Sequence, residues 1–451
     1  MTLALPNPGA GPNPGAGPAT GAADSGLRTG RTDRTEQHGP LRRAVAAIEA
    51  RTPAHRDRGI DGLRALALLA VPAGHWLAGG FTRDADGALH NASALSALGF
   101  LAPVSWVLQL LGIFFLVGGY SSVLSYRRAS GRGESTARWL GGRLARLGRP
   151  ALAVTAIWAL LIGGLSAAGV PEATLRTGAT LVVQPLWFVG VYAGVTALTP
   201  YCVRAARRLG PWAAAPLFAA VAVVDFLRYG PYAAAVPSWL ALLNLLPGWL
   251  FAYQLGVCWG EGEAPTPSGQ RQRGRLGRRA AWTLLTGGAA VFAVLLLVFH
   301  YPASMVGVPG AARTNSHPPS LLVPALAAAQ CGAAVLLRDR IAALLRRPAL
   351  WAPVVVVNLC AMTVFCWHQT AMLAVAVPSS SLGPVPGLTT APDSTAWLLT
   401  RLAWLPLFAL TLAALTLLTR RFEAPWGASR TRLGAATALS ASFTLFALGV
   451  G

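Results

Sequence analysis

Residues 58–80 read RGIDGLRALALLAVPAGHWLAGG, an apolar run that contains an arginine and a histidine. From Ile60 to Gly80 it has about the 20 residues that a helix needs to cross the hydrocarbon, so we expect the first transmembrane span here. His75 follows Arg64 by eleven residues, which is roughly 1100° of helical rotation and within about 20° of three full turns. The two side chains therefore share a helix face, and His75 lies roughly 16 Å further along the axis, near mid-bilayer.

Each of these two residues has two interpretations. His75 is either a structural histidine that is hydrogen-bonded to a neighbouring helix or a functional group, and Arg64 is either a boundary charge or a ligand-binding group. A charged side chain at membrane depth costs about 2.5 to 3.5 kcal/mol on insertion scales and usually marks a substrate path or a catalytic site. The spacing favours a functional His75 and leaves Arg64 open.

Composition and charge extend this prediction to the whole chain. The 451 residues are 54% hydrophobic and 12% charged, which is typical of an all-α polytopic membrane protein. The net charge of +21 comes from arginines without any lysine, clustered at residues 28–58, 127–149, 204–208, 271–279, 338–347 and 420–432. These clusters alternate with arginine-poor loops, as the positive-inside rule predicts for a multi-pass protein of the cell membrane with a cytoplasmic N-terminus. The charge therefore indicates topology and contact with membrane lipids and argues against a nucleic-acid partner.

The spans divide the chain into three parts. We expect residues 1–58 to be a disordered cytoplasmic tail, although 41–51 is also compatible with a short basic helix. Residues 59–421 form the transmembrane domain, and 422–451 form a C-terminal tail with a possible eleventh helix. The ten spans expected before it lie near residues 60–80, 98–126, 150–168, 180–200, 212–228, 237–260, 281–299, 320–337, 351–369 and 397–419. The five cysteines lack metal-type spacing, so no metal is expected.

Several motifs resemble the acyltransferase-3 family of integral membrane enzymes. The run Asp61-Gly62-Leu63-Arg64 followed by His75 is similar to the family's opening helix. Phe114-Phe115 followed by Gly118-Gly119 resembles its Phe-Phe...Ser-Gly signature, except that Gly118 stands where a serine is usual. Weaker similarities are Leu186-Trp187-Phe188, the Trp367-His368 pair, and the series Arg143, Arg146, Arg149 before Pro150.

The resemblance implies a reaction and a set of site residues. An acyl group, expected to be acetyl, would move from acyl-CoA to a hydroxyl of a carbohydrate, a lipid-linked sugar or a small molecule, as in O-acetylation of the cell envelope. The enzyme would thus transfer groups other than aminoacyl groups, with His75 as general base. The donor phosphates would bind Arg64, Arg143, Arg146 and Arg149, because planar guanidinium groups pair bidentately with phosphate. Contact of these arginines with lipid headgroups is the alternative. Asp61, Trp187 and His368 are expected to support the site, His368 either along the acceptor path or as an interfacial histidine.

A transporter or flippase for a lipid-linked or small polar substrate is the competing function. Such proteins also place ionisable residues at mid-membrane and break their helices. The chain shows no repeat that relates its two halves, and its intramembrane ionisable residues concentrate in one helix. These two features favour the acyltransferase. A polar segment at residues 313–319, RTNSHPP, is either an acceptor contact or a solvated turn.

Overall fold

The computed structural model describes residues 39–231, 233–263, 276–308, 313–423 and 430–449. Residues 1–44 and 45–451 form separate units, and the packing described below concerns the second unit alone. The helices are α1 (Pro40–Ala50), α2 (Arg58–Ala78), α3 (Ala94–Ala97), α4 (Ala102–Leu108), α5 (Leu111–Gly131), α6 (Thr136–Ala167), α7 (Glu172–Val183), α8 (Trp187–Ala197), α9 (Thr199–Leu209), α10 (Ala215–Tyr229), α11 (Leu245–Glu263), α12 (Arg278–Leu297), α13 (Leu322–Leu344), α14 (Pro348–Leu359), α15 (Ala361–Ser379), α16 (Thr395–Thr419) and α17 (Arg430–Leu448). Two strands, β1 (Gly79–Arg83) and β2 (Leu89–Ser93), follow α2.

The prediction of an all-α polytopic membrane protein is confirmed. Nine helical segments among the described residues are long and apolar enough to cross a membrane. The first expected span, α2, is not among these nine, because Asp61, Arg64 and His75 lower its mean hydropathy. It nevertheless packs against α5, α13 and α15, which do meet that criterion. The expected eleventh span corresponds to α17, a shorter apolar helix.

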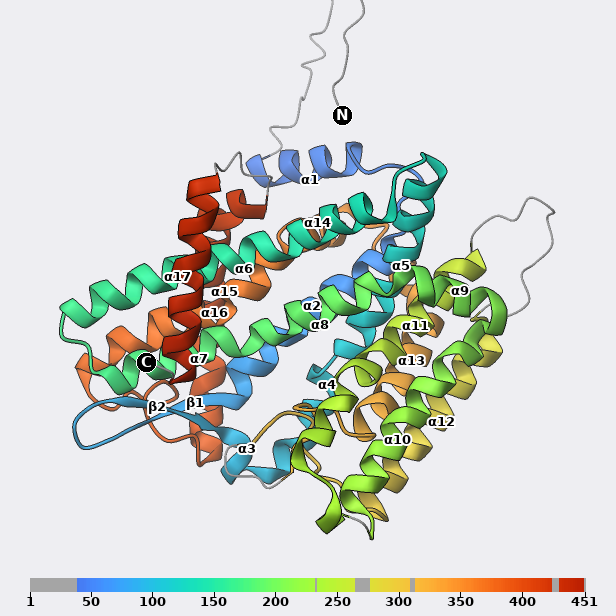
Figure 1. Cartoon of the computed structure of the whole chain (residues 1–451). Coiled ribbons are helices and arrows are strands. Elements are labelled where there is room, and N and C mark those ends of the chain that lie inside the picture. The colour runs from blue at the N-terminus through green and yellow to red at the C-terminus, as the bar shows by residue number, and fades with distance from the viewer. Residues whose placement is uncertain (1–38, 232, 264–275, 309–312, 424–429, 450–451) are drawn as a thin grey trace, which may run out of the picture. The chain divides into compact units, whose positions relative to one another are not determined.

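Helix α2 lies between two groups of helices (Figure 1). On one side are α5 and α9 to α13, and on the other are α6, α7, α15, α16 and α17. Helix α8 contacts α5 and α11 of the first group and α6 of the second. The helix that carries the predicted functional residues is therefore covered by neighbours from both halves of the chain.

Three local predictions differ from the structure. The loop after α2 contains an antiparallel hairpin in which Gly79 pairs with Ser93 and Arg83 with Leu89. The third span was expected to begin at Pro150, but α6 begins at Thr136 and continues through that proline. Proline is tolerated inside a membrane helix where neighbouring groups satisfy the freed carbonyl. The ninth span, expected from residue 351, is divided between α14, which ends at Leu359, and α15, which begins at Ala361. Of the predicted tail, residues 40–50 are helical, in agreement with the alternative for 41–51, and residues 1–38 lie outside the described part.

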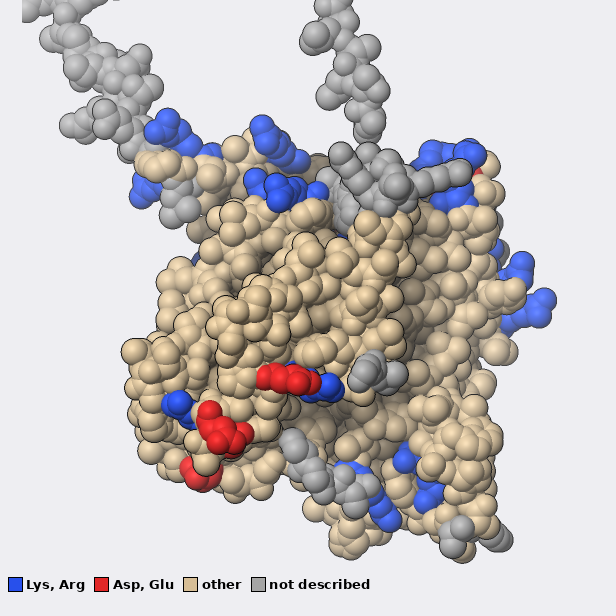
Figure 2. Space-filling model, turned by 60° about the vertical axis from the view of Figure 1, so that its left-hand side comes forward, with Lys and Arg blue, Asp and Glu red and all other residues tan. Residues whose placement is uncertain are grey.

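The two ends of the bundle differ in charge. We call the end that carries α9, the start of α6 and the end of α13 the arginine end, and the end that carries β1, β2 and residues 300–320 the hairpin end. Arginines gather at one end of the face in Figure 2, and a broad belt without charge separates them from the charged side chains at the opposite end. Such a belt is the surface expected of a protein that lies in a bilayer.

Close contact between α5 and α11 depends on glycines. A Cβ added to Gly119 would lie 2.1 Å from the carbonyl oxygen of Tyr253, and one added to Gly256 would lie 1.9 Å from that of Leu116. Both distances are far shorter than a carbon and an oxygen can approach, so neither position accepts a side chain in this packing. Small residues let membrane helices approach in this way, and α5 is thereby fixed beside α2.

Arg401 of α16 fixes the end of α2 that is nearest His75. Its side chain is fully buried and donates hydrogen bonds to the carbonyls of Trp76 (2.7 Å), Gly79 (2.7 Å) and Gly387 (2.9 Å). The first two carbonyls belong to the C-terminal turn of α2, where helical partners run out and the helix dipole favours a cation. Arg401 thus supplies hydrogen-bond donors to the carbonyl groups at the C-terminal end of α2, the helix that carries His75.

We expect Arg401→Met to lower the stability of the protein substantially. The variant leaves two buried carbonyls and one partly buried carbonyl without this donor, at about 1 to 3 kcal/mol for each buried group, so a loss of about 3 kcal/mol is expected. The measurement is thermal unfolding of the detergent-purified protein. Arg340→Met, at an exposed position on α13, should change stability by no more than about 0.5 kcal/mol. Equal melting temperatures for the two variants would contradict this role.

Candidate active site

His75 meets two polar side chains of α15. Its ring centroid lies 5.0 Å from that of His368, and its Nδ1 is 3.2 Å from the amide nitrogen of Gln369. His368 is fully buried and Gln369 is 2% exposed, whereas His75 remains partly exposed. One face of the His75 imidazole is therefore fixed by α15, and part of the ring stays accessible.

The hydrogen bonds of His368 define its protonation. Its Nδ1 donates to the carbonyl oxygen of Phe365 one turn earlier, so the neutral ring keeps its lone pair on Nε2. That Nε2 is buried and has no partner among the described residues. An unpaired buried acceptor is costly, and such atoms concentrate where a ligand or reacting group completes the hydrogen bonding. His368 therefore offers an acceptor directly beside His75.

The orientation of the Gln369 amide is linked to the tautomer of His75, that is, to which ring nitrogen carries the proton. In the observed orientation the NH₂ group donates to Nδ1, and the amide oxygen is buried without a partner in the described structure. Because the two ends of an amide have almost the same size, a half-turn of the group fits the same volume. The oxygen then accepts from Nδ1–H, and the lone pair of His75 moves to Nε2. Gln369 can thus hold His75 in either tautomer.

Trp76 joins α2 to α15 beside this cluster. Its indole nitrogen donates to the backbone carbonyl of His368 at 2.9 Å, and its own carbonyl accepts from Arg401. Both helices are therefore tied together one residue away from His75. This connection fixes the distance between the two imidazoles.

Arg64 lies on the same face of α2 as His75, nearer to the arginine end. Its guanidinium hydrogen-bonds to the hydroxyl of Ser121 on α5 and lies 3.5 Å from a carboxylate oxygen of Asp61. Asp61 is already paired with Arg56 through both of its oxygens. The side chain of Arg64 is 27% exposed although it lies between helices. Arg64 therefore shares the negative charge of Asp61 with Arg56, and its side chain keeps accessible surface.

Arg143 of α6 reaches the same serine. Its Nη2 lies 3.3 Å from the carbonyl oxygen of Ser121 and 3.2 Å from the hydroxyl of Ser122, and its buried Nε has no partner among the described residues. Arg64 and Arg143 are close enough for their charges to interact. Two guanidinium groups thus converge on one serine, an arrangement that suits an anion.

Arg146 and Arg149 extend this positive surface along α6. Arg146 is exposed and bonds only to the carbonyl of Gly142 on its own helix. Arg149 is partly exposed and makes no ion pair within the described ranges. The structure thus brings Arg64 and Arg143 together and leaves Arg146 and Arg149 at the surface of α6.

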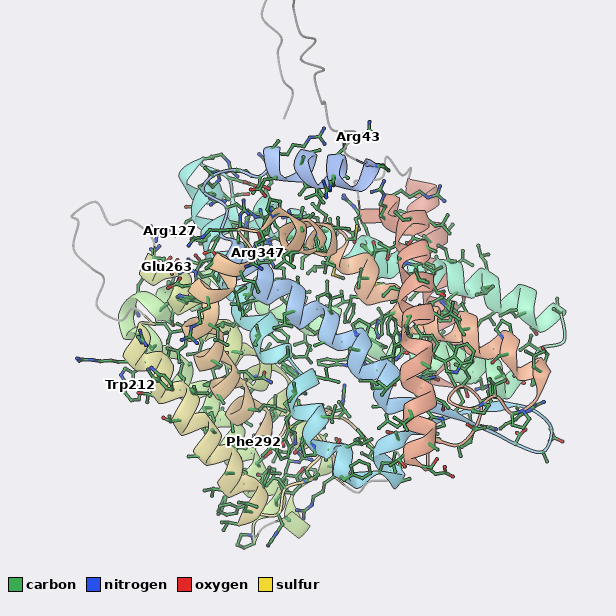
Figure 3. All side chains as sticks on the ribbon, turned by 180° about the vertical axis from the view of Figure 1, so that it is seen from behind. Arg43, Arg127, Trp212, Glu263, Phe292 and Arg347 are labelled. Atoms are coloured by element: carbon green, nitrogen blue, oxygen red, sulfur yellow. The ribbon has the colours of Figure 1, made fainter. Side chains whose placement is uncertain are left out.

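Three further carboxylates at the arginine end, those of Asp57, Glu261 and Glu263, are paired with other arginines. Glu261 lies 2.9 Å from Arg207 and 3.4 Å from Arg127, and Arg338 bonds both Asp57 and Glu263. Figure 3 shows Arg127, Glu263 and Arg347 at this end of the bundle. Because these acids have their own arginines, they do not neutralise the pair formed by Arg64 and Arg143.

Trp187 contacts a further histidine, His317. At the start of α8, its indole packs edge-to-face with the imidazole of His317, with the ring centroids 4.9 Å apart. Burial lowers the pKa of His317, although the residue also keeps exposed surface. His317 is also close enough to His75 for charges on the two rings to interact. The segment 313–319 is thus folded onto the bundle and is not a solvated turn.

Sequence reasoning overlooked two polar residues of this site. Gln369 directly follows His368, so its position in an apolar span was a usable signal. Ser121 gave no such signal, because its role depends on the approach of α5 to α2 and α6. Within the described residues, no group of three His, Cys, Asp or Glu side chains is placed to hold a metal ion.

Comparison with known proteins gives one match. The acyltransferase-3 family model, described as an acyltransferase domain, matches residues 57–420. No curated protein and no solved structure matches the chain. The matched range covers α2 to α16 and therefore includes every residue of the site described above.

Proposed function

Because the chain belongs to the acyltransferase-3 family and is a membrane acyltransferase, we propose that it moves an acyl group, in the simplest case acetyl, from acyl-CoA to a hydroxyl of its acceptor. The observation that carries the proposal is the pairing of two chemistries on one helix. Arg64, next to Arg143, can hold phosphate, and His75, eleven residues further along the same helix, can act as a base.

The donor would enter from the arginine end. Coenzyme A carries three phosphate groups, and Arg64 and Arg143 supply guanidinium groups whose charge nearby carboxylates only partly neutralise. The rise of roughly 16 Å from Arg64 to His75 suits an extended pantetheine arm. Under the positive-inside rule we assign this end to the cytoplasm, where acyl-CoA is made.

The proposed chemistry needs one proton acceptor at His75. The acceptor hydroxyl gives its proton to Nε2 of His75 while its oxygen attacks the thioester carbonyl carbon. When the tetrahedral intermediate collapses, the carbon–sulfur bond breaks, and the imidazolium returns its proton to the departing thiolate. The products are the ester and free coenzyme A, and His75 is neutral again. A base of this kind typically contributes 10²- to 10⁴-fold in rate.

Gln369 orients the base in this scheme. For Nε2 to accept the proton, Nδ1 must carry a hydrogen. The amide oxygen of Gln369 would accept from it after a half-turn of the amide group, which places the oxygen where the nitrogen now lies. That hydrogen bond strengthens when the ring becomes an imidazolium, because hydrogen bonds to charged groups contribute about 1.5 to 3 kcal/mol.

We therefore expect Gln369→Leu to lower kcat about 10- to 100-fold with little change in KM for acyl-CoA, and Gln369→Glu, which keeps the acceptor oxygen, to retain more activity. Steady-state kinetics of both variants measures this. Equal losses for the two variants would argue against the hydrogen bond.

The acceptor would approach past Trp187 and His317. Both side chains keep accessible surface, and His317 lies within electrostatic range of His75. An aromatic ring beside a hydrogen-bonding imidazole suits a polyhydroxylated compound, because its apolar C–H face can stack while its hydroxyls find partners. We propose a carbohydrate, lipid-linked sugar or similar small hydroxyl compound, and His368 would accept a hydrogen bond from it.

The first test is the thermal stability of the purified protein with increasing acetyl-CoA. A ligand at 100 times its dissociation constant stabilises the folded state by about 2.7 kcal/mol, which is visible as a shifted melting curve. Acetate at the same concentration should produce no shift. If no acyl-CoA shifts the melting curve at any concentration, the proposal of an acyl-CoA donor is wrong. Transport of a polar substrate then becomes the function to test.

A further inference from the structure

Tyr192 of α8 is a polar aromatic residue that the mechanism above does not use. It lies on the helix that contacts both α5 and α6, and it is within electrostatic range of Arg64. Its side chain is partly exposed, and its hydroxyl makes no hydrogen bond to any described residue. A tyrosine hydroxyl inside a membrane protein normally has a partner, so this one is available to a ligand.

The position of the Tyr192 ring is set by four aromatic neighbours. Its centroid lies 5.6 Å from that of Phe114, 5.8 Å from Phe115, 5.7 Å from Phe188 and 6.5 Å from Tyr253. These distances are within the range of favourable ring contacts. A ring held on several sides points its hydroxyl in a defined direction, as a binding residue requires.

Gly118 of α5 makes room for this hydroxyl. A Cβ built on Gly118 would lie 2.7 Å from the hydroxyl oxygen of Tyr192 and 2.8 Å from Cε2. Any side chain at position 118 would therefore displace the ring. Gly118 stands where a serine is usual in the motif that this stretch resembles. The hydroxyl of Tyr192 fills the space that a serine side chain would take.

We propose that Tyr192 donates a hydrogen bond to the pantetheine arm of the bound acyl-CoA, between the phosphates at Arg64 and the thioester at His75. This inference rests on the proposed function and assigns one further donor-binding residue to it. The arm carries two amides whose carbonyl oxygens accept hydrogen bonds from a hydroxyl. Gly118 is then a specificity-determining position, because it keeps Tyr192 in place.

Two ligands distinguish binding of the pantetheine arm from binding of the phosphates. Acetyl-CoA contains both, whereas adenosine 3′,5′-bisphosphate contains the nucleotide and phosphates and lacks the arm. We expect Tyr192→Phe to weaken acetyl-CoA binding about 3- to 10-fold, the effect of losing one neutral hydrogen bond, and to leave bisphosphate binding unchanged. Dissociation constants come from melting curves at increasing ligand concentration, with KM for acetyl-CoA as a second readout.

Two further variants complete the design. Gly118→Ala should weaken acetyl-CoA binding and leave bisphosphate binding unchanged, because the added carbon displaces the Tyr192 ring. Tyr253→Phe is the matched control: its hydroxyl is buried and bonded to Thr199 at 2.7 Å, so its loss should lower the melting temperature without changing acetyl-CoA affinity.

Each outcome has a distinct meaning. The inference is overturned if Tyr192→Phe binds acetyl-CoA as tightly as wild type, or if it loses affinity for both ligands equally. If the wild-type protein binds neither ligand, the proposed function itself fails, whatever Tyr192 does.

Discussion

Replacing His75 by alanine is expected to lower kcat for acyl transfer by about 10²- to 10⁴-fold and to leave acetyl-CoA binding nearly intact. In the proposed mechanism the imidazole acts as the base, whereas the phosphates would be held roughly 16 Å away at Arg64. The measurement combines release of free coenzyme A thiol in the presence of an acceptor with the melting-curve shift in its absence. Loss of turnover with a preserved shift separates chemistry from binding.

His368→Ala is the matched control for the His75 variant. It removes the second imidazole, 5.0 Å from the first, and leaves the Gln369 contact to His75 in place. We expect a smaller loss, with a raised KM for the acceptor, because His368 would bind the acceptor and does not take its proton. If His368→Ala lost more activity than His75→Ala, the roles of the two histidines would have to be exchanged.

A covalent acyl-histidine is an alternative use of the same imidazole. In that route His75 attacks the thioester first, and the protein carries the acyl group before the acceptor binds. Mass spectrometry of the protein after incubation with acetyl-CoA alone distinguishes the two routes. We expect no added acetyl mass on the α2 peptide, and a stoichiometric adduct at His75 would establish the covalent route instead.

The sequence was sufficient to predict the helix α2 and the shared face of Arg64 and His75 on it. The rotation of roughly 1100° between Arg64 and His75 depends only on helix geometry, and α2 is helical from Arg58 to Ala78. The membrane-spanning architecture was also predictable, because apolar runs and arginine clusters are local properties of the chain.

Other parts of the site depend on contacts between distant segments. The pairing of His75 with Gln369 exists because α15 packs against α2, and nothing local to either residue indicates that pairing. The convergence of Arg64 and Arg143 at Ser121 likewise needs three helices. By contrast, Arg401 could have been found, because a lone arginine within the apolar run 395–419 is itself a sign of a specific role.

Replacing Arg64 by alanine is expected to remove most of the affinity for acyl-CoA. A charge-assisted hydrogen bond contributes about 1.5 to 3 kcal/mol, which corresponds to roughly 10- to 150-fold in the dissociation constant. The melting-curve shift by acetyl-CoA, and the shift by adenosine 3′,5′-bisphosphate, should therefore both become small. Rising salt should weaken binding to the wild-type protein more than binding to the variant, because fewer charges take part in the variant.

Arg149→Ala is the control that distinguishes a phosphate site from general positive charge. It also removes one arginine from the arginine end, but the side chain of Arg149 does not join Arg64 and Arg143 at Ser121. If the phosphates bind at Ser121, Arg64→Ala and Arg143→Ala weaken binding together, and Arg149→Ala has a much smaller effect. Equal effects of all three would mean that the arginines act as a diffuse field toward lipid headgroups. The phosphate site would then have to be sought elsewhere, and the proposal of a base at His75 would be unaffected.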